Sequence, residues 1–276
     1  MPELFPLHLR AVQVRRFKPW PDAFPFNVPI IKNLEELTFT SPVTILVGEN
    51  GSGKSTLLEA IACAANSITV GSESVSKDKS LASVRTLAAD LKLVWSKKIR
   101  RGFFMRSEDF FGYVRYINTL HEEMENDLRE IEEEYRNRSA AARELAEQSL
   151  KHEMTSMRQS YGEGLDARSH GESYLALFQS RFVPGGLYLM DEPEAPLSPT
   201  RQLSFLALLH SMVAQDAQFI IATHSPILMA YPGAVILNCD KGKLTETAFD
   251  DLEHVDILRT FLNDPESYFR YLFEEN

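Results

Sequence analysis

Short apolar runs alternate with amphipathic stretches over most of this 276-residue chain. The clearest run is VTILV at residues 43–47, a β-branched segment typical of a buried parallel strand. Further strand signals lie at residues 8–14, 36–47, 186–190, 219–223 and 234–238. Helix patterns follow at residues 54–65 and 199–215. Strands that alternate with helices predict an α/β fold whose sheet is mostly parallel.

The interval from about residue 107 to residue 160 has a helical and strongly charged pattern. Apolar or aromatic side chains recur three or four residues apart in a seam formed by Leu120, Met124, Leu128, Ile131 and Tyr135. This spacing predicts an amphipathic helix. Eight of the thirteen residues from 122 to 134 are acidic, which disfavours DNA binding by this helix. We favour packing of the seam within its own lobe, and binding of a partner protein is the alternative.

Composition adds limits on location and partners. The net charge of −10 argues against a broad nucleic-acid-binding surface, although a local basic stripe stays possible. Only Cys63 and Cys239 are present, far apart and without metal-ligand spacing, which is typical of a reduced compartment. The first residues lack the apolar core of a signal peptide, and no apolar run approaches bilayer length. We therefore expect a cytoplasmic protein with no direct membrane insertion.

The segment GENGSGKST matches the phosphate-binding pattern G-x-x-x-x-G-K-[ST], and it lies between a predicted strand and a predicted helix. Glycines let the backbone wrap around phosphates, so that N–H groups and the helix N-terminus point at the negative charge. We expect ATP here, with Lys54 at the β- and γ-phosphates, Ser55 on Mg²⁺ and Thr56 at the α-phosphate. The predicted nucleotide-binding residues are Gly48, Glu49, Asn50, Gly51, Ser52, Gly53, Lys54, Ser55 and Thr56.

Two further predicted strands end in polar residues. The segment LYLMDEP places Asp191 and Glu192 after four apolar residues, and FIIATHSP places His224 after another apolar run. Open α/β sheets bind ligands at the carboxyl ends of their strands. We expect Asp191 to hold Mg²⁺ together with Ser55, and Glu192 to act as the general base for the attacking water. Lys54 and His224 complete the predicted catalytic set, His224 by reaching the γ-phosphate or that water.

The order of these motifs, with SHGES (169–173) between the helical interval and LMDEP, resembles the ATP-binding-cassette class over most of residues 36–240. In that class a signature motif, commonly LSGGQ, caps the γ-phosphate held by the other subunit of a dimer. The resemblance assigns this role to Ser169, Gly171 and a helix that starts near Glu172. His170 stands where the class usually has glycine.

Within the class, GENGSGKST and ATHSP look like the SMC, RecF and double-strand-break-repair side. DEPEAPLSP is similar to the form found in stand-alone AAA-type ATPases of bacteria and phages, although Ser198 replaces the usual aspartate. No glutamine occurs between Gln13 and Gln148, so the Q-loop residue is missing, and Arg106 or Glu108 is left to couple the lobes. An adenine-contacting residue is expected before the phosphate loop, with Arg16, Phe17 and Phe24 as the possibilities.

The resemblance implies a P-loop NTPase fold: a mostly parallel sheet, an antiparallel N-terminal β part, and a helical lobe inserted between the phosphate loop and the signature. The expected ATP-binding lobe covers about residues 1–106 and 183–276, and the helical lobe about 107–182. The implied function is an ATPase that dimerises around ATP and acts as a conformational switch on a protein or nucleic acid, in DNA repair, DNA maintenance or phage defence. A transporter subunit and a low-turnover nucleotide-gated scaffold are the alternatives.

The segment SKKIRRGFFMR (96–106) carries five basic residues around Phe103 and Phe104. Basic and aromatic residues in this mixture can line a nucleic-acid backbone or an acidic face of a partner. Because the whole chain is acidic, we favour a charged strand at the edge of the sheet beside two core phenylalanines.

Overall fold

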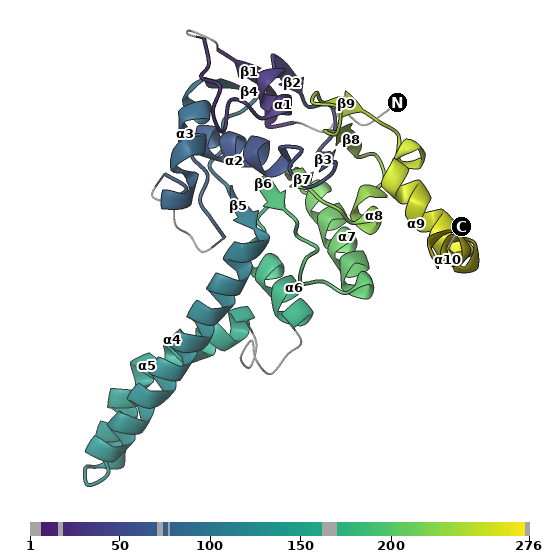
Figure 1. Cartoon of the computed structure of the whole chain (residues 1–276). Helices are drawn as coiled ribbons and strands as arrows, with labels where there is room; N and C mark the ends of the chain where they lie inside the picture. The colour runs from purple at the N-terminus through teal and green to yellow at the C-terminus, as the bar shows by residue number, and fades with distance from the viewer. Residues whose placement is uncertain (1–6, 16–18, 71–73, 77, 162–169, 274–276) are drawn as a thin grey trace.

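The computed structural model describes residues 7–15, 19–70, 74–76, 78–161 and 170–273. Its central sheet has the order β5-β6-β7-β3-β8-β9, with parallel pairing as far as β8 and an antiparallel last pair (Figure 1). Its strands are β3 (Val43–Val47), β5 (Gly102–Arg106), β6 (Leu187–Asp191), β7 (Gln218–Ala222), β8 (Val235–Asn238) and β9 (Thr245–Glu246). The predicted mostly parallel α/β sheet is confirmed.

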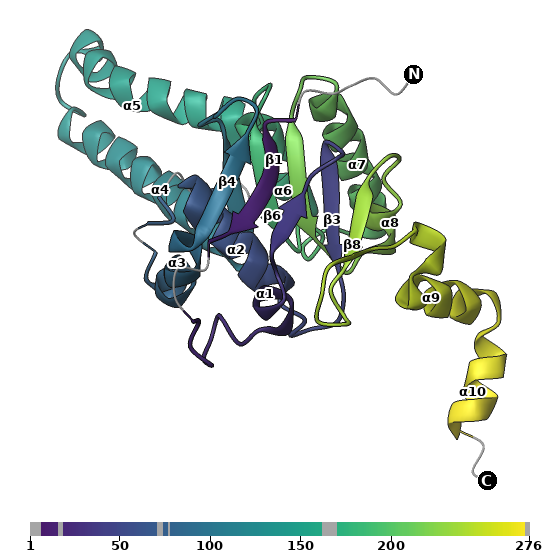
Figure 2. The same cartoon turned by 90° about the horizontal axis from the view of Figure 1, so that it is seen from above.

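A smaller antiparallel sheet in the order β2-β1-β4 lies over one face of the central sheet (Figure 2). It is formed by β1 (Leu9–Val14), β2 (Glu36–Thr38) and β4 (Leu91–Trp95), and it confirms the expected antiparallel N-terminal part. The strand signals over residues 36–47 correspond to two separate strands, β2 and β3. Chain segments 36–38 and 43–47 join different sheets, and Pro42 between them has no N–H for a ladder.

Helices cover both faces of the central sheet. On one face, α2 (Lys54–Ala65) shares a core with α3 (Ala82–Ala89) and the short η1 (Lys79–Leu81). On the other face, α6 (His170–Arg181) and α7 (Pro199–Val213) form a second core with the sheet. The remaining helical segments are α1 (Pro29–Lys32), α8 (Pro226–Met229), η2 (Phe249–Asp251), α9 (Glu253–Asn263) and α10 (Pro265–Phe273). The five residues of β3, like those of β6 and β7, are all buried.

Two long helices, α4 (Ser107–Glu134) and α5 (Ala140–Tyr161), form an antiparallel hairpin that projects away from the sheet (Figure 1). Met124 of the predicted seam is buried and the other seam residues are half-buried. Ile131 lies against a hollow shared with Ala146 and Leu150 of α5. The seam therefore packs inside the hairpin, as we favoured. Within the described residues, no helix is both long and apolar enough to cross a membrane.

Aromatic side chains attach α6 to the sheet. The ring of Phe178 lies 5.0 Å from that of Phe205 on α7, and the ring of Phe182 lies 4.5 Å from that of Tyr188 on β6. Phe103 on β5 lies 5.0 Å from Tyr188, so the aromatic residues of the basic segment belong to the core, on a strand at the edge of the sheet, as favoured. The helix α6 lies within the expected helical lobe, yet it shares the core of the sheet. The division into an ATP-binding lobe and a helical lobe therefore stays a prediction.

Replacing Phe178 with alanine should lower the free energy of unfolding by about 3–5 kcal/mol, because it empties a fully buried aromatic site between α6, α7 and the sheet. Urea denaturation followed by circular dichroism would measure this loss. Leu145→Ala, at a side chain 74% exposed on α5, is the control and should change stability by less than about 0.5 kcal/mol. Equal effects of the two substitutions would show that α6 is not held by this cluster.

Candidate functional site

The phosphate-binding segment joins β3 to α2 through a loop that two glycines make possible. Gly48 has φ +141° and Gly53 has φ +102°, conformations that L side chains rarely adopt. A Cβ atom on Gly53 would lie 2.5 Å from Cγ1 of Val28, and one on Gly48 would lie 2.6 Å from Oδ1 of Asp240. The loop thus has no room for other residues at these points, and α2 begins with its N-terminus at the loop.

Lys54, the first residue of α2, is buried and directs its ammonium group back into the loop. Its Nζ donates to the carbonyl oxygens of Gly48 at 2.6 Å and Glu49 at 2.8 Å. Burial lowers the pKa of Lys54, against the opposing effect of nearby acidic groups that include Asp191. Glu49, Asn50 and Gly51 are exposed, so the outer part of the loop is open to a ligand.

The carboxyl ends of β6 and β7 lie next to this loop. Residue Ala222 of β7 pairs with both Leu46 of β3 and Asp191 of β6, so the three strands end at one edge of the sheet. Asp191 is the last residue of β6, and Glu192 follows it. His224 lies two residues beyond the end of β7. The sheet therefore brings Lys54, Asp191, Glu192 and His224 to one place, as the positions after strands predicted.

Asp191 is a buried carboxylate beside the first turn of α2. Burial raises its pKa to about 6, against a hydrogen bond from the Ser55 hydroxyl that favours the charged form. Its Oδ1 atom is buried and has no hydrogen-bond partner. Mg²⁺ commonly binds one or two protein oxygen ligands and takes its remaining ligands from phosphates and water. Ser55 and Asp191 thus fit the expected Mg²⁺ site.

Glu192 and His224 face each other across the open side of the site. Glu192 has φ +49°, and its N–H donates to the carbonyl oxygen of Ala222 at 2.8 Å. This unusual backbone turn directs the side chain to within 3.8 Å of His224, measured from Oε1 to Nε2. Each of the two side chains is 41% exposed. The pair can therefore contact water and a substrate from solvent.

Glu194 is a residue of the site to which the sequence assigned no role. Its Oε1 accepts the backbone N–H groups of His224 at 2.7 Å and Ser225 at 3.1 Å. The Ser225 hydroxyl in turn donates to Oε1 of Gln202 on α7 at 2.5 Å. Glu194 therefore fixes the loop that carries His224. The signal in the sequence was its place as the fourth residue of DEPE, between two strands that end at the same edge.

Asp240 is a second residue that sequence reasoning missed. It follows β8, and its Oδ1 accepts the backbone N–H of Glu49 at 2.6 Å. Together with Gly48, Glu49 and His254 of α9, it lines a hollow of about 330 Å³ beside the loop. The available signal in the sequence was the position of Asp240, an acidic residue two positions after β8, which pairs with β3.

The remaining predicted residues lie in different parts of the structure, and some fall outside the described residues. Thr56 is half-buried in the first turn of α2, and Ser52 donates its N–H to the carbonyl oxygen of Glu49 at 3.2 Å. Ser198, in place of the usual aspartate, is the N-cap of α7. Phe24 is 54% exposed. Gly171 lies in the first turn of α6, whereas the predictions for Arg16, Phe17 and Ser169 fall outside the described residues.

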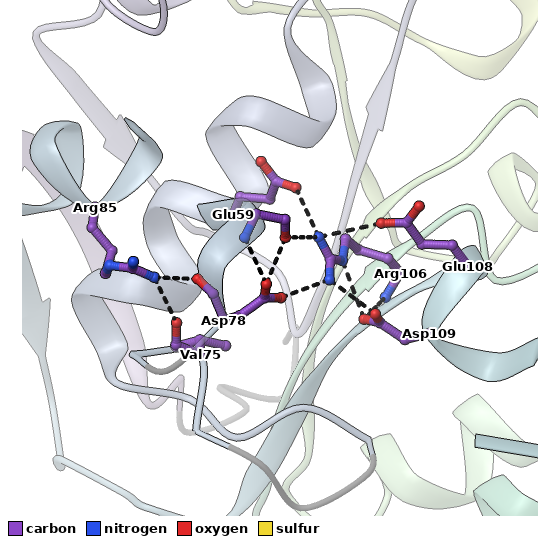
Figure 3. Close-up of polar contacts among 8 residues, drawn as sticks. Glu59, Val75, Asp78, Arg85, Arg106, Glu108 and Asp109 are labelled. Atoms are coloured by element: carbon purple, nitrogen blue, oxygen red, sulfur yellow. Dashed lines mark hydrogen bonds and ion pairs between the residues drawn. The ribbon is translucent and has the colours of Figure 1, made fainter. Parts of the chain in front are cut away.

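Arg106 and Glu108, the two residues proposed in place of the Q-loop glutamine, lie in one network of ion pairs (Figure 3). Arg106 ends β5 in register with Asp191. Its guanidinium contacts four carboxylates, those of Glu59, Asp78, Glu108 and Asp109. Burial raises the pKa of Glu59 to about 7, with Arg106 opposing the shift.

Comparison with known proteins agrees with this geometry. A family model described as "AAA domain, putative AbiEii toxin, Type IV TA system" matches residues 75–230, more than half of the chain, and a second AAA-domain model matches residues 24–85. The chain belongs to the AAA family of P-loop ATPase domains. The family assignment confirms the resemblance drawn from the order of the motifs.

A curated relative is the DNA replication and repair protein RecF of Synechococcus sp. (strain JA-2-3B'a(2-13)), 31% identical over 130 residues. The match covers 40% of this chain and 30% of the relative, so most of the relative's length lies outside the match. Among solved structures, a nucleotide-free ATP-binding cassette of an ABC transporter has a TM-score of 0.46 at 15% identity, covering 95% of this chain and 98% of the other. The Smc head domain of Pyrococcus furiosus, solved with the C-terminal domain of ScpA, has a TM-score of 0.44 at 12% identity, covering 92% and 99%.

Replacing Glu194 with alanine should lower the rate of ATP hydrolysis about tenfold, because the backbone N–H groups of His224 and Ser225 lose their common acceptor. ATP affinity should change little, since the phosphate loop makes no contact with Glu194 among the described hydrogen bonds. Phosphate release and equilibrium binding of a fluorescent ATP analogue would measure the two quantities. A loss of binding equal to the loss of rate would contradict this role.

Glu59 should make the stability of the protein depend on pH. Its folded-state pKa of about 7 lies above its ordinary value of 4.5, so between these values the folded protein binds more protons than the unfolded chain. The free energy of unfolding should therefore fall as the pH rises from 5 to 8. The charged groups that face Glu59 are Arg106, Asp191, Glu108 and Asp78, and Arg106 alone favours the ionised form.

The Glu59→Gln variant should lose this part of the pH dependence, amounting to about 2–3 kcal/mol between pH 5 and pH 8. Urea denaturation of both proteins at the two pH values would measure it. Glu133→Gln, at an exposed acid of the hairpin, is the control and should keep the wild-type dependence. An unchanged slope in Glu59→Gln would refute the assignment.

Proposed function

We propose that this AAA-family domain binds ATP with Mg²⁺ and hydrolyses it at the edge where β3, β6 and β7 end. The observation that carries the proposal is the convergence of Lys54, Asp191, Glu192 and His224 at that edge, beside the N-terminus of α2. A phosphate chain there would meet backbone N–H groups and a buried ammonium group.

Each side chain has a role that follows from its place. Lys54 would exchange its contacts with the loop carbonyls for the β- and γ-phosphates, and Ser55 with Asp191 would hold Mg²⁺. When bound, Mg²⁺ would neutralise charge that develops on the phosphates. Glu192 would take the proton of the attacking water, and His224, 3.8 Å away, would orient that water or the γ-phosphate.

We further propose that two copies of the chain enclose the nucleotide. Glu192 and His224 are each 41% exposed, so a single chain leaves the reacting groups open to solvent. Phosphoryl transfer is faster where the site excludes bulk water and the groups are held fixed. In the proposed dimer, Ser169 and Gly171 before and within α6 of one copy would cover the γ-phosphate bound by the other. Hydrolysis removes that phosphate, so the equilibrium would return to separate chains.

The output of this cycle would be a conformational switch that acts on a protein or nucleic-acid partner. The partial match to RecF supports a place in DNA repair or maintenance, and the description of the matching family supports phage defence. The acidic balance of the chain favours a protein partner or a locally basic contact over a broad nucleic-acid surface.

The Glu192→Gln variant should accumulate as an ATP-bound dimer, because it retains the nucleotide contacts and loses the base that ends the cycle. Light scattering after gel filtration should give a dimer with ATP and Mg²⁺, and a monomer with ADP or without nucleotide. Glu134→Gln, at an exposed acid on α4, is the matched control and should stay monomeric during turnover. A Glu192→Gln protein that is monomeric at saturating ATP would refute the ATP-enclosing dimer.

A further inference from the structure

Arg106 lies where three parts of the molecule meet. It is the last residue of β5, it pairs in register with Asp191, and α4 begins at the next residue. The side chain is only 12% exposed. Because no linker separates β5 from α4, the hairpin leaves the sheet directly at this residue (Figure 1).

Toward the hairpin, Arg106 is held by Asp109 in the first turn of α4. Nη2 of Arg106 lies 2.9 Å from Oδ1 of Asp109, and Nε lies 3.2 Å from Oδ2. Oδ2 also accepts the backbone N–H of Arg106 at 3.1 Å. Such a two-pronged contact fixes orientation as well as distance. Glu108 lies 3.2 Å from Nη1, but it is 72% exposed and contributes little.

On the side of the phosphate loop, Arg106 contacts α2 and the segment that precedes α3. Nη2 lies 2.7 Å from Oδ2 of Asp78, and Nη1 donates to the Ser80 hydroxyl at 2.9 Å. Arg85 of α3 donates to the carbonyl oxygen of Asp78, which ties this segment to α3. Nη1 also lies 3.8 Å from Oε1 of Glu59 on α2, five residues after Lys54. One guanidinium thus bridges the start of the hairpin and the helix that begins at the phosphate loop.

We propose that Arg106 is a positioning residue that couples the α4–α5 hairpin to the nucleotide end of α2, so that the rate of hydrolysis depends on where the hairpin is held. This inference rests on the proposed ATPase activity. With 28 residues, α4 is about 42 Å long, so a small rotation at Arg106 corresponds to a large displacement at the far end of the hairpin. A load or partner on the hairpin would therefore act on Ser55 and Asp191 through this contact.

The kinetic test compares Arg106→Ala, Arg106→Lys and the control Arg129→Ala. Arg129 is exposed on α4 and bonds only within its own helix among the described contacts. In Arg106→Ala the turnover number should fall about 10–100-fold while ATP affinity stays within about threefold, since the phosphate loop itself is unchanged. Lysine keeps the positive charge but lacks the planar guanidinium that binds a carboxylate through two nitrogens. Arg106→Lys should therefore be faster than Arg106→Ala and slower than the wild type. Arg129→Ala should match the wild type.

Hydrogen exchange supplies a readout that a purely structural role would not change. ATP should slow amide exchange in the first six residues of α4, 107–112, in the wild type and not in Arg106→Ala. If Arg106→Ala does not fold, Asp109→Asn is the second variant, because it keeps the shape of the side chain and removes one charge that faces the arginine. It should lower the turnover number several-fold and weaken the ATP-induced protection of α4.

Three results would overturn the inference. They are a turnover number of Arg106→Ala within about twofold of wild type, a loss of ATP affinity as large as the loss of rate, and equal ATP-induced protection of α4 in both proteins. A wild-type protein that binds ATP but releases no phosphate would refute the proposed function and this inference with it. Full hydrolysis by Arg106→Ala would refute this inference alone.

Discussion

The location of the site depends on the parallel pairing of β3 with β7 on one side and β8 on the other. Val43, Ile45 and Val47 of β3 pack in the core on one face of the sheet and Leu46 packs in the core on the other, so a shift of one residue would move each side chain to the wrong core. The carboxyl end of β3 therefore has one position. The phosphate loop leaves from that end, and α2 returns over the sheet with Leu57, Leu58 and Ile61 fully buried.

The site built on this frame contains more negative than positive charge. Lys54 lies near the carboxylates of Asp191, Glu192 and Asp240, and Asp191 is both buried and without a partner for Oδ1. Burying a carboxylate in this way is unfavourable unless a cation compensates it. In the proposed function, Mg²⁺ would supply this compensation when it binds with the nucleotide. Burial of the carboxyl group is the main cause of the raised pKa of both Asp191 and Glu59.

Local sequence patterns predicted the parts of the site that follow one another along the chain. The strand at residues 43–47, the phosphate loop and the acidic end of β6 each have a pattern that is complete within about ten residues. The contacts of Glu194 with His224 and of Asp240 with Glu49 join residues 30 and 191 positions apart. No local pattern carries such a contact, because it depends on which strands become neighbours in the sheet. The strand signals over residues 36–47 likewise did not show that β2 and β3 join different sheets, because that too depends on distant pairing partners.

The central claim is that the edge formed by β3, β6 and β7 hydrolyses ATP. The most direct measurement is release of inorganic phosphate from ATP by the purified chain, with and without Mg²⁺, beside the Lys54→Ala variant. We expect Mg²⁺-dependent release that Lys54→Ala lowers at least about a hundredfold, because the buried ammonium group at the phosphate loop is lost. Equal release by the two proteins, or release that does not depend on Mg²⁺, would contradict the assignment of the site.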